Sequence, residues 1–156
     1  MRLPRKRPPP AAVSPDACRF VGISTEPGRG AGPDTGLYQF FTPDGVYVSL
    51  HETDCTSLTY TPGPDPTLTA RFRFDPDWTP PELVDRPVVV LRFRGAHLLV
   101  WDTDADEEDT YRLPDAPGGQ VSTLDWDGDR MFALGLLTIQ VVLTAHTVEV
   151  STEAAG

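Results

Sequence analysis

The side chains best suited to proton transfer or metal binding form the run HETDC at residues 51–55. Side chains on an extended strand alternate between its two faces. If the run is a strand, His51 and Cys55 share one face, while Glu52 and Asp54 share the other. Because the run concentrates groups that can transfer protons, we treat His51, Glu52 and Asp54 as a candidate polar site. The alternative is a polar strand end that leads into a turn.

A zinc site at this run would need ligands from elsewhere in the chain. Zinc in proteins takes three or four side-chain ligands, and only His51 and Cys55 would lie on a common face of the strand. The missing ligands would have to come from His97 or His146 across a sheet. No motif spacing points to such a set, so we expect no metal and no cofactor.

Acidic residues alternate at 102–106 and again at 125–129, as they do in the first half of an EF-hand calcium loop. In the first run the sixth position is Glu107 where the motif needs Gly, and the twelfth is Leu113 where it needs Glu. In the second run the glycine is Gly128, at the fourth position where the motif needs it at the sixth. Two solvated turns are the simpler interpretation, because Asp favours turns; weak calcium binding by both loops remains an alternative.

The first of these runs opens the most acidic segment of the chain, with six acids in the eight residues 102–109. Such a density of charge resists burial. We therefore predict that this segment is a contact surface for a basic protein partner. Its acidic residues are Asp102, Asp104, Asp106, Glu107, Glu108 and Asp109.

No local signature of a covalent catalyst accompanies the nucleophilic side chains. Ser, Cys, His and carboxylates are all present, but nothing resembles the nucleophile elbow of a hydrolase. We expect a protein that is not an enzyme. The alternative is a small-ligand-binding or metal-assisted β-barrel enzyme with His51, Glu52 and Asp54 near its mouth. A structural accessory domain is a further alternative.

The chain is acidic, with a formal net charge of −10 over 156 residues. The charge is uneven, because six of the 13 basic residues but two of the 23 acidic ones precede Gly30. An acidic body repels phosphate backbones, which argues against nucleic acid as a partner. No apolar stretch follows the basic N-terminus, and none elsewhere is long enough to span a bilayer. We expect a cytoplasmic protein that does not bind membranes.

The sequence patterns predict that the elements positioning these residues are strands. Residues 67–74 (TLTARFRF) alternate apolar and polar side chains, as in a half-buried antiparallel strand. Hairpin turns are indicated at 42–45 (TPDG) and 127–129 (DGD), where Asp-Gly tolerates positive φ. The apolar runs predict further strands at 17–23, 37–41, 46–51, 56–61, 121–126, 130–134, 136–145 and 147–151. A single helical turn is expected at 81–84.

The longest apolar run is VVVLRFRGAHLLVWD at residues 88–102. We interpret it as a hairpin of two central strands, with Gly95 in the turn. The expected fold is mainly β, an antiparallel sandwich or partly closed barrel of about nine strands with little helix. We expect a disordered basic, Pro-rich tail at 1–16, one β domain at 17–151 and a frayed C-terminus at 152–156.

The order of these patterns resembles small β-rich bacterial immunity proteins of polymorphic toxin systems and related domains. The resemblance rests on Leu50-His51 followed by acids, on TLTARF at 67–72, on VLRFRGA at 90–96, and on the pattern at 131–150. The family usually has Asp directly after the histidine, where this chain has Glu52. The resemblance implies a protein that neutralises a toxin domain by binding it. Together with the acidic body, it predicts a non-enzymatic immunity protein for a basic toxin.

Overall fold

The structure is a computed structural model, and it describes residues 16–32, 36–103 and 119–155. The tail expected to be disordered, residues 1–15 of it, lies outside these ranges, as does most of the acidic segment. Within the described residues, helical structure consists of three 3₁₀ turns, η1 (Leu50–Glu52), η2 (Pro76–Trp78) and η3 (Pro81–Leu83). The mainly-β fold is therefore confirmed.

Eleven strands are present in the described ranges, and most follow the apolar patterns of the sequence. They are β1 (Arg19–Val21), β2 (Gln39–Phe41), β3 (Tyr47–Ser49), β4 (Thr53–Thr61), β5 (Thr67–Phe74), β6 (Val88–Arg94), β7 (His97–Thr103), β8 (Gly119–Trp126), β9 (Met131–Leu136), β10 (Ile139–Thr144) and β11 (Thr147–Glu153).

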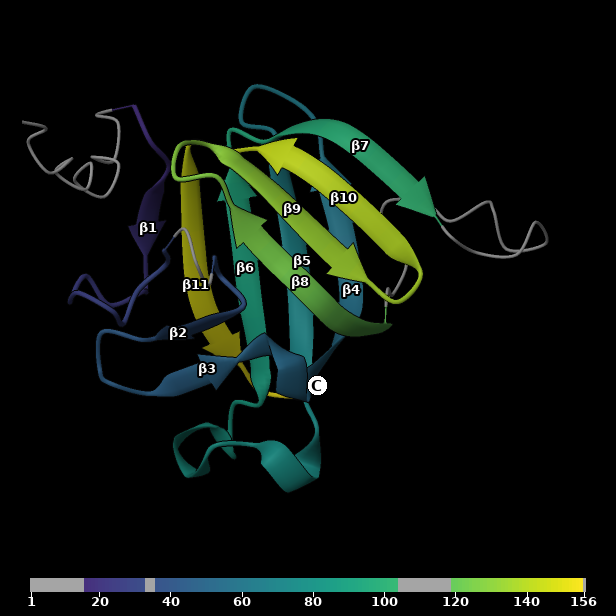
Figure 1. Cartoon of the computed structure of the whole chain (residues 1–156). Coiled ribbons are helices and arrows are strands. Elements are labelled where there is room, and N and C mark those ends of the chain that lie inside the picture. The colour runs from purple at the N-terminus through teal and green to yellow at the C-terminus, as the bar shows by residue number, and fades with distance from the viewer. Residues whose placement is uncertain (1–15, 33–35, 104–118, 156) are drawn as a thin grey trace, which may run out of the picture.

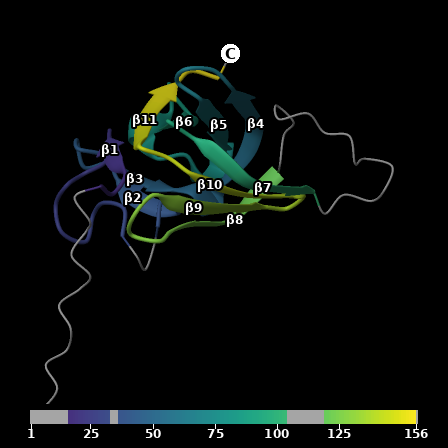
Figure 2. The same ribbon diagram turned by 90° about the horizontal axis from the view of Figure 1, so that it is seen from above.

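Nine of these strands form one sheet in the order β1-β11-β6-β5-β4-β8-β9-β10-β7, and β2 pairs with β3 in a separate hairpin. Neighbours run antiparallel except β1 and β11, which are parallel. The sheet turns a corner between β4 and β8, where two residue pairs hold it together, Asp54 with Gln120 and Cys55 with Gly119. Strands β11, β6, β5 and β4 form one layer, and β8, β9, β10 and β7 cross it as a second (Figures 1 and 2).

The core lies between the two layers and is built by alternate side chains of each strand. In β5, Leu68, Ala70, Phe72 and Phe74 are buried, while the threonines and arginines between them face outward, as the alternation predicts. The second layer contributes buried side chains in the same way, and these are Leu124, Trp126, Phe132, Leu134, Val141 and Leu143. The open sandwich agrees with the expected fold class.

The hairpin expected over residues 88–102 is wrong. β6 pairs with β5 on one side and β11 on the other, so neither of its edges is open to β7. β7 pairs instead with β10, at the opposite edge of the sheet. Gly95, with φ of +62°, turns the chain from one layer into the other. A glycine turn between two apolar runs fits a corner between layers as well as it fits a hairpin, so the pattern alone does not choose.

The second arm of that run is also not a central strand. Leu99 is 53% exposed and Val100 is 44% exposed on β7, which forms an edge of the sheet. The expected turns at 42–45 and 127–129 do join hairpins, β2 with β3 and β8 with β9. At the other end of the chain, β11 continues through Glu153, two residues past its expected end at Ser151. In the described residues, no helix is long and apolar enough to cross a membrane.

Candidate functional site

A polar pocket of about 300 Å³ lies at the corner of the sheet where β4 pairs with β8. It brings together the three residues of the candidate polar site, His51, Glu52 and Asp54. The segment 75–78, which follows β5, and the start of β8 contribute the rest of its wall together with Thr53. The full lining is His51, Glu52, Thr53, Asp54, Asp75, Trp78 and Gln120. We call it the acidic pocket.

The local backbone explains why His51, Glu52 and Asp54 lie together. Residues 50–52 form the 3₁₀ turn η1, and the strand begins only at Thr53. Consecutive side chains of a 3₁₀ turn are about a third of a turn apart, so the strict alternation assumed for a strand fails here. The expected pairing of His51 with Cys55 on one face is therefore wrong, because Cys55 is buried in the core.

Backbone and hydroxyl hydrogen bonds fix the wall of the pocket. The buried hydroxyl of Thr53 donates to the Leu50 carbonyl at 2.7 Å, which ties η1 to the start of β4. The N–H of Asp75 donates to the Glu52 carbonyl at 3.0 Å. One carboxylate oxygen of Asp75 accepts the N–H of Asp77 at 2.9 Å and so caps η2. The acidic pocket is therefore held by its own scaffold before any ligand arrives.

The sequence patterns did not single out Asp75, Gln120 or Tyr38. The antiparallel pairing of β4 with β5 could have pointed to Asp75, because the register places Phe74 opposite Thr53 and so carries Asp75 past the start of β4. Gln120 arrives through the short β4–β8 pairing, which joins residues far apart in the chain. No local pattern in the sequence reports such a contact.

A tyrosine supports the histidine of the pocket. The Tyr38 hydroxyl lies 2.7 Å from Nδ1 of His51. Burial, and then the negative charge of Glu52, raise the pKa of Tyr38 above its usual value. The phenol therefore keeps its proton at neutral pH, and it can donate a hydrogen bond when Nδ1 of His51 is the acceptor nitrogen of the ring. The other ring nitrogen, Nε2, then carries the N–H of that tautomer.

The pocket is strongly negative. Glu52, Asp54 and Asp75 place three carboxylates on one small surface, and none of them forms an ion pair with a described basic residue. Trp78 belongs to the same wall and is 64% exposed. Carboxylates beside an open indole face can bind a guanidinium or ammonium group by charge, by hydrogen bonds and by cation–π contact.

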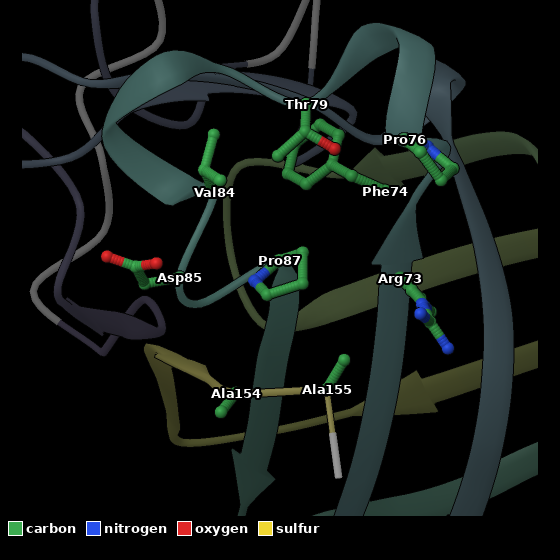
Figure 3. A pocket seen from close by; sticks show the side chains of 9 residues that line it. All are labelled: Arg73, Phe74, Pro76, Thr79, Val84, Asp85, Pro87, Ala154 and Ala155. Carbon is green, nitrogen blue, oxygen red and sulfur yellow. The ribbon is translucent and has the colours of Figure 1, made fainter.

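A second, more apolar pocket of about 460 Å³ lies on the far side of the 75–87 loop. Figure 3 shows Arg73 and Asp85 on opposite sides of it, with Phe74 and Pro87 between them. Its lining is Arg73, Phe74, Pro76, Thr79, Val84, Asp85, Pro87, Ala154 and Ala155. The loop contributes an exposed side chain to each pocket, Trp78 to the acidic pocket and Val84, which is 63% exposed, to the apolar pocket. We call the acidic pocket, this apolar pocket and the loop together the loop face.

Asp102 is the one residue of the predicted acidic contact surface that lies within the described ranges. Asp102 is exposed on β7, opposite Gln140 of β10. Asp104, Asp106, Glu107, Glu108 and Asp109 lie outside the described residues, so the surface stays a prediction. In the other acidic run, a carboxylate oxygen of Asp127 accepts the N–H groups of Asp129 and Met131 at 2.8 and 3.1 Å. That is the role of an Asp that shapes a turn.

The described part of the chain brings no three His, Cys, Asp or Glu side chains together in a group that could hold a metal ion. Both cysteines are buried as thiols. Comparison with known proteins gives no match for the chain among protein-family models, curated proteins or solved structures.

Proposed function

We propose that this protein is a non-enzymatic binding domain that recognises a basic protein partner through the loop face. The acidic pocket receives an arginine or lysine side chain of the partner. The observation that carries the proposal is the convergence of Glu52, Asp54 and Asp75, which form no ion pair with a described residue, beside the exposed indole of Trp78.

The chemistry of the pocket suits a cationic side chain that arrives from outside. Each carboxylate that lines the pocket attracts a cation, and an opposite charge within about 4–6 Å of a carboxylate favours its charged form. A guanidinium donates in a planar fork that matches carboxylate oxygens, and it stacks on aromatic rings. Each such charge-assisted hydrogen bond contributes about 1.5–3 kcal/mol to binding. An arginine is therefore the best-matched occupant.

The rest of the loop face has the features of a protein contact. Exposed tryptophan is enriched among the residues that dominate binding energy at interfaces. Trp78 and Val84 project from one loop, with a pocket on each side that could take side chains of a partner. The apolar pocket supplies area for burial, and Arg73 and Asp85 at its two sides supply orientation.

The finer form of the proposal is an immunity protein that neutralises a basic toxin domain. The net charge of −10 supports it, because a field of this sign speeds encounter with a basic protein. The resemblance of the sequence patterns to immunity proteins supports it as well. In this proposal the segment 102–109 adds a second contact, the location is cytoplasmic, and neither nucleic acid nor a membrane is bound.

The direct test uses the protein encoded beside this one. If a neighbouring gene encodes a large secreted protein with a variable C-terminal domain, that domain is purified and its affinity is measured by calorimetry. The variant Glu52→Gln/Asp75→Asn should weaken binding at least about tenfold, since it removes two charge-assisted contacts. The matched control Asp44→Asn changes an exposed acid in the β2–β3 turn and should leave affinity unchanged. A loss of binding free energy in Asp44→Asn half as large as that in the double variant would show that only net charge matters, because the control removes one charge and the double variant removes two.

A second test needs no natural partner. A short peptide that contains Arg-Gly-Arg is titrated into the protein while tryptophan fluorescence is followed. The signal should saturate, and Trp78→Phe should remove the change, because Trp78 is the most exposed large apolar residue of the loop face. A peptide with Glu in place of Arg should give no change. Saturation that is retained in Trp78→Phe would contradict the assignment of this pocket.

One observation favours the alternative of a small-ligand-binding or metal-assisted enzyme. The Tyr38–His51 hydrogen bond orients an imidazole in a pocket that Glu52, Asp54 and Asp75 also line, and side chains of these types can move protons. Metal analysis of the purified protein separates the two proposals. Stoichiometric, tightly bound zinc that is lost in His51→Ala would favour the enzyme.

A further inference from the structure

A third pocket, of about 450 Å³, lies at the other end of the sandwich and is lined mainly by polar atoms. Its walls come from the start of β1, the β8–β9 turn and the β10–β11 turn. The lining residues are Asp16, Ala17, Arg19, Arg130, His146 and Thr147. We propose that Arg19, Arg130 and His146 form a binding site for a phosphate monoester, independent of the loop face.

Backbone hydrogen bonds tie the three walls to one another. These bonds join the start of β1 to both turns and join the two turns to each other, so the sheet fixes the backbone from which the side chains project. The bonds run from Cys18 N–H to the Asp129 carbonyl at 2.7 Å, from Arg19 N–H to the His146 carbonyl at 2.9 Å, and from Ala145 N–H to the Arg130 carbonyl at 3.0 Å. A site built on such a frame loses little entropy when a ligand binds.

The absence of a side chain at Gly95 leaves the space in which the imidazole of His146 packs. Gly95 lies in the turn between β6 and β7 with φ of +62°, and a Cβ atom there would lie 2.4 Å from Cδ2 of His146. The imidazole therefore packs against the bare backbone of Gly95. Its Nδ1 lies 3.5 Å from a terminal nitrogen of Arg130. When that nitrogen donates to Nδ1, Nε2 carries the ring proton and is itself a hydrogen-bond donor.

The two arginines of this pocket form no salt bridge with an acid in the described part of the chain. Three arginines, Arg29, Arg71 and Arg94, pair with carboxylates, whereas Arg19 and Arg130 form no ion pair with a described acid. Asp16 is the one acid in the lining, and it already makes another interaction. The carboxylate of Asp127 in the β8–β9 turn accepts backbone N–H groups of its own turn. Two guanidinium groups thus remain for an anion.

The size and polarity of the pocket identify the class of anion. Guanidinium forks and an imidazole N–H match the oxygens of a phosphate group. The volume falls within the range of about 300–1,000 Å³ that is typical of small-molecule pockets, so it leaves room beyond a single tetrahedral ion. The mainly polar lining suits a hydroxylated body such as a sugar. A sugar phosphate therefore fits better than free phosphate does.

The test is calorimetric titration with ribose 5-phosphate and, separately, with inorganic phosphate, at constant ionic strength. Ribose 5-phosphate should bind at one site and more tightly than inorganic phosphate. Arg130→Gln should raise its dissociation constant about tenfold or more, because a charge-assisted pair is lost. The control Arg29→Gln removes an exposed arginine that pairs with Glu26 far from this pocket and should bind as the wild type does.

Three results would overturn the proposal. The first is no saturable binding of either anion to the wild type. The second is equal affinity in Arg130→Gln, with circular dichroism showing that the variant is folded. The third is tighter binding of inorganic phosphate, which would contradict the assignment to a monoester. Arg130→Gln should keep its affinity for a basic protein partner, so this site and the loop face can fail separately.

Discussion

At the scale of single residues, Asp75 shows how one side chain can serve both the fold and the site. Its backbone N–H bonds to Glu52, its carboxylate caps η2, and its charge belongs to the acidic pocket. The sequence indicated His51, Glu52 and Asp54 because they are contiguous. It did not indicate Asp75 or Gln120, because these join the pocket through strand pairing, which depends on the three-dimensional fold.

Thr53 tests how far the pocket depends on its buried scaffold. Thr53→Val removes the hydroxyl that donates to the Leu50 carbonyl. The backbone N–H of Thr53 still donates to the same carbonyl, so the loss in unfolding free energy should be about 1 kcal/mol. Denaturant unfolding measures the loss. Affinity for an arginine peptide should fall as well, because η1 carries His51 and Glu52; unchanged affinity would show that η1 holds its place without the hydroxyl.

Cys18 gives the protein a dependence on alkaline pH. Burial raises the pKa of its thiol from 9.0 to about 12. The native state therefore retains a proton that the unfolded chain loses above pH 9. Stability is unaffected by this group below pH 9 and declines as the pH rises from 9 to about 12. Unfolding free energies measured across this range should fall less steeply in Cys18→Ala.

Tyr38 also has a raised pKa, so it contributes to the same decline. A Tyr38→Phe variant separates its share from that of Cys18. An identical alkaline slope in wild type and Cys18→Ala would contradict the assignment to the thiol. At neutral pH the buried thiol should react slowly with alkylating reagents, since the thiolate is the reactive form.

At the scale of elements, local signals predicted strands and turns well but predicted their partners less well. The alternation at 67–74 and the Asp-Gly turns specify local geometry, and β5 and both hairpins follow them. The run at 88–102 failed because both of its arms are apolar. Its first arm, β6, pairs with β5 on one edge and with β11 on the other. Local sequence patterns do not identify which strands pair with one another.

The two arms of this run should differ in their response to the same substitution. Leu91 is fully buried in β6, so Leu91→Ala should cost about 2–5 kcal/mol of unfolding free energy. Leu91→Asp should abolish folding, because it buries an unpaired charge. Leu99 on β7 is 53% exposed, so Leu99→Ala should change stability by about 0.5 kcal/mol or less. Equal costs at both positions would contradict the edge position of β7.

At the scale of the whole molecule, charge and architecture lead to different surfaces. The net charge of −10 affects how a partner approaches from a distance. The two polar pockets instead determine which groups of a bound partner or ligand are contacted. The fold class followed from the many short strands and turns. The positions of the pockets did not, because both lie where segments distant in the chain meet.

Long-range charge predicts a salt effect on binding. The association rate constant with a basic partner should fall as salt rises from about 0.01 to 0.15 M, where the screening length shrinks from about 30 to 8 Å. The dissociation rate constant should change less, because it reports contacts in the bound state. Stopped-flow measurements separate the two. A salt effect confined to dissociation would show that the field of the acidic body does not steer the encounter.

The pairing of β1 with β11 bears on how the protein is made. Residues 19–21 lie beside residues 147–149, and the other edge of β11 completes β6. During synthesis β1 therefore waits until residues 147–149 have left the ribosome before it can pair. Pairings of such long sequence separation slow folding. A chain released before Thr147 leaves the edge of β6 unpaired and open to other chains, so incomplete products should aggregate where the full-length protein stays dispersed.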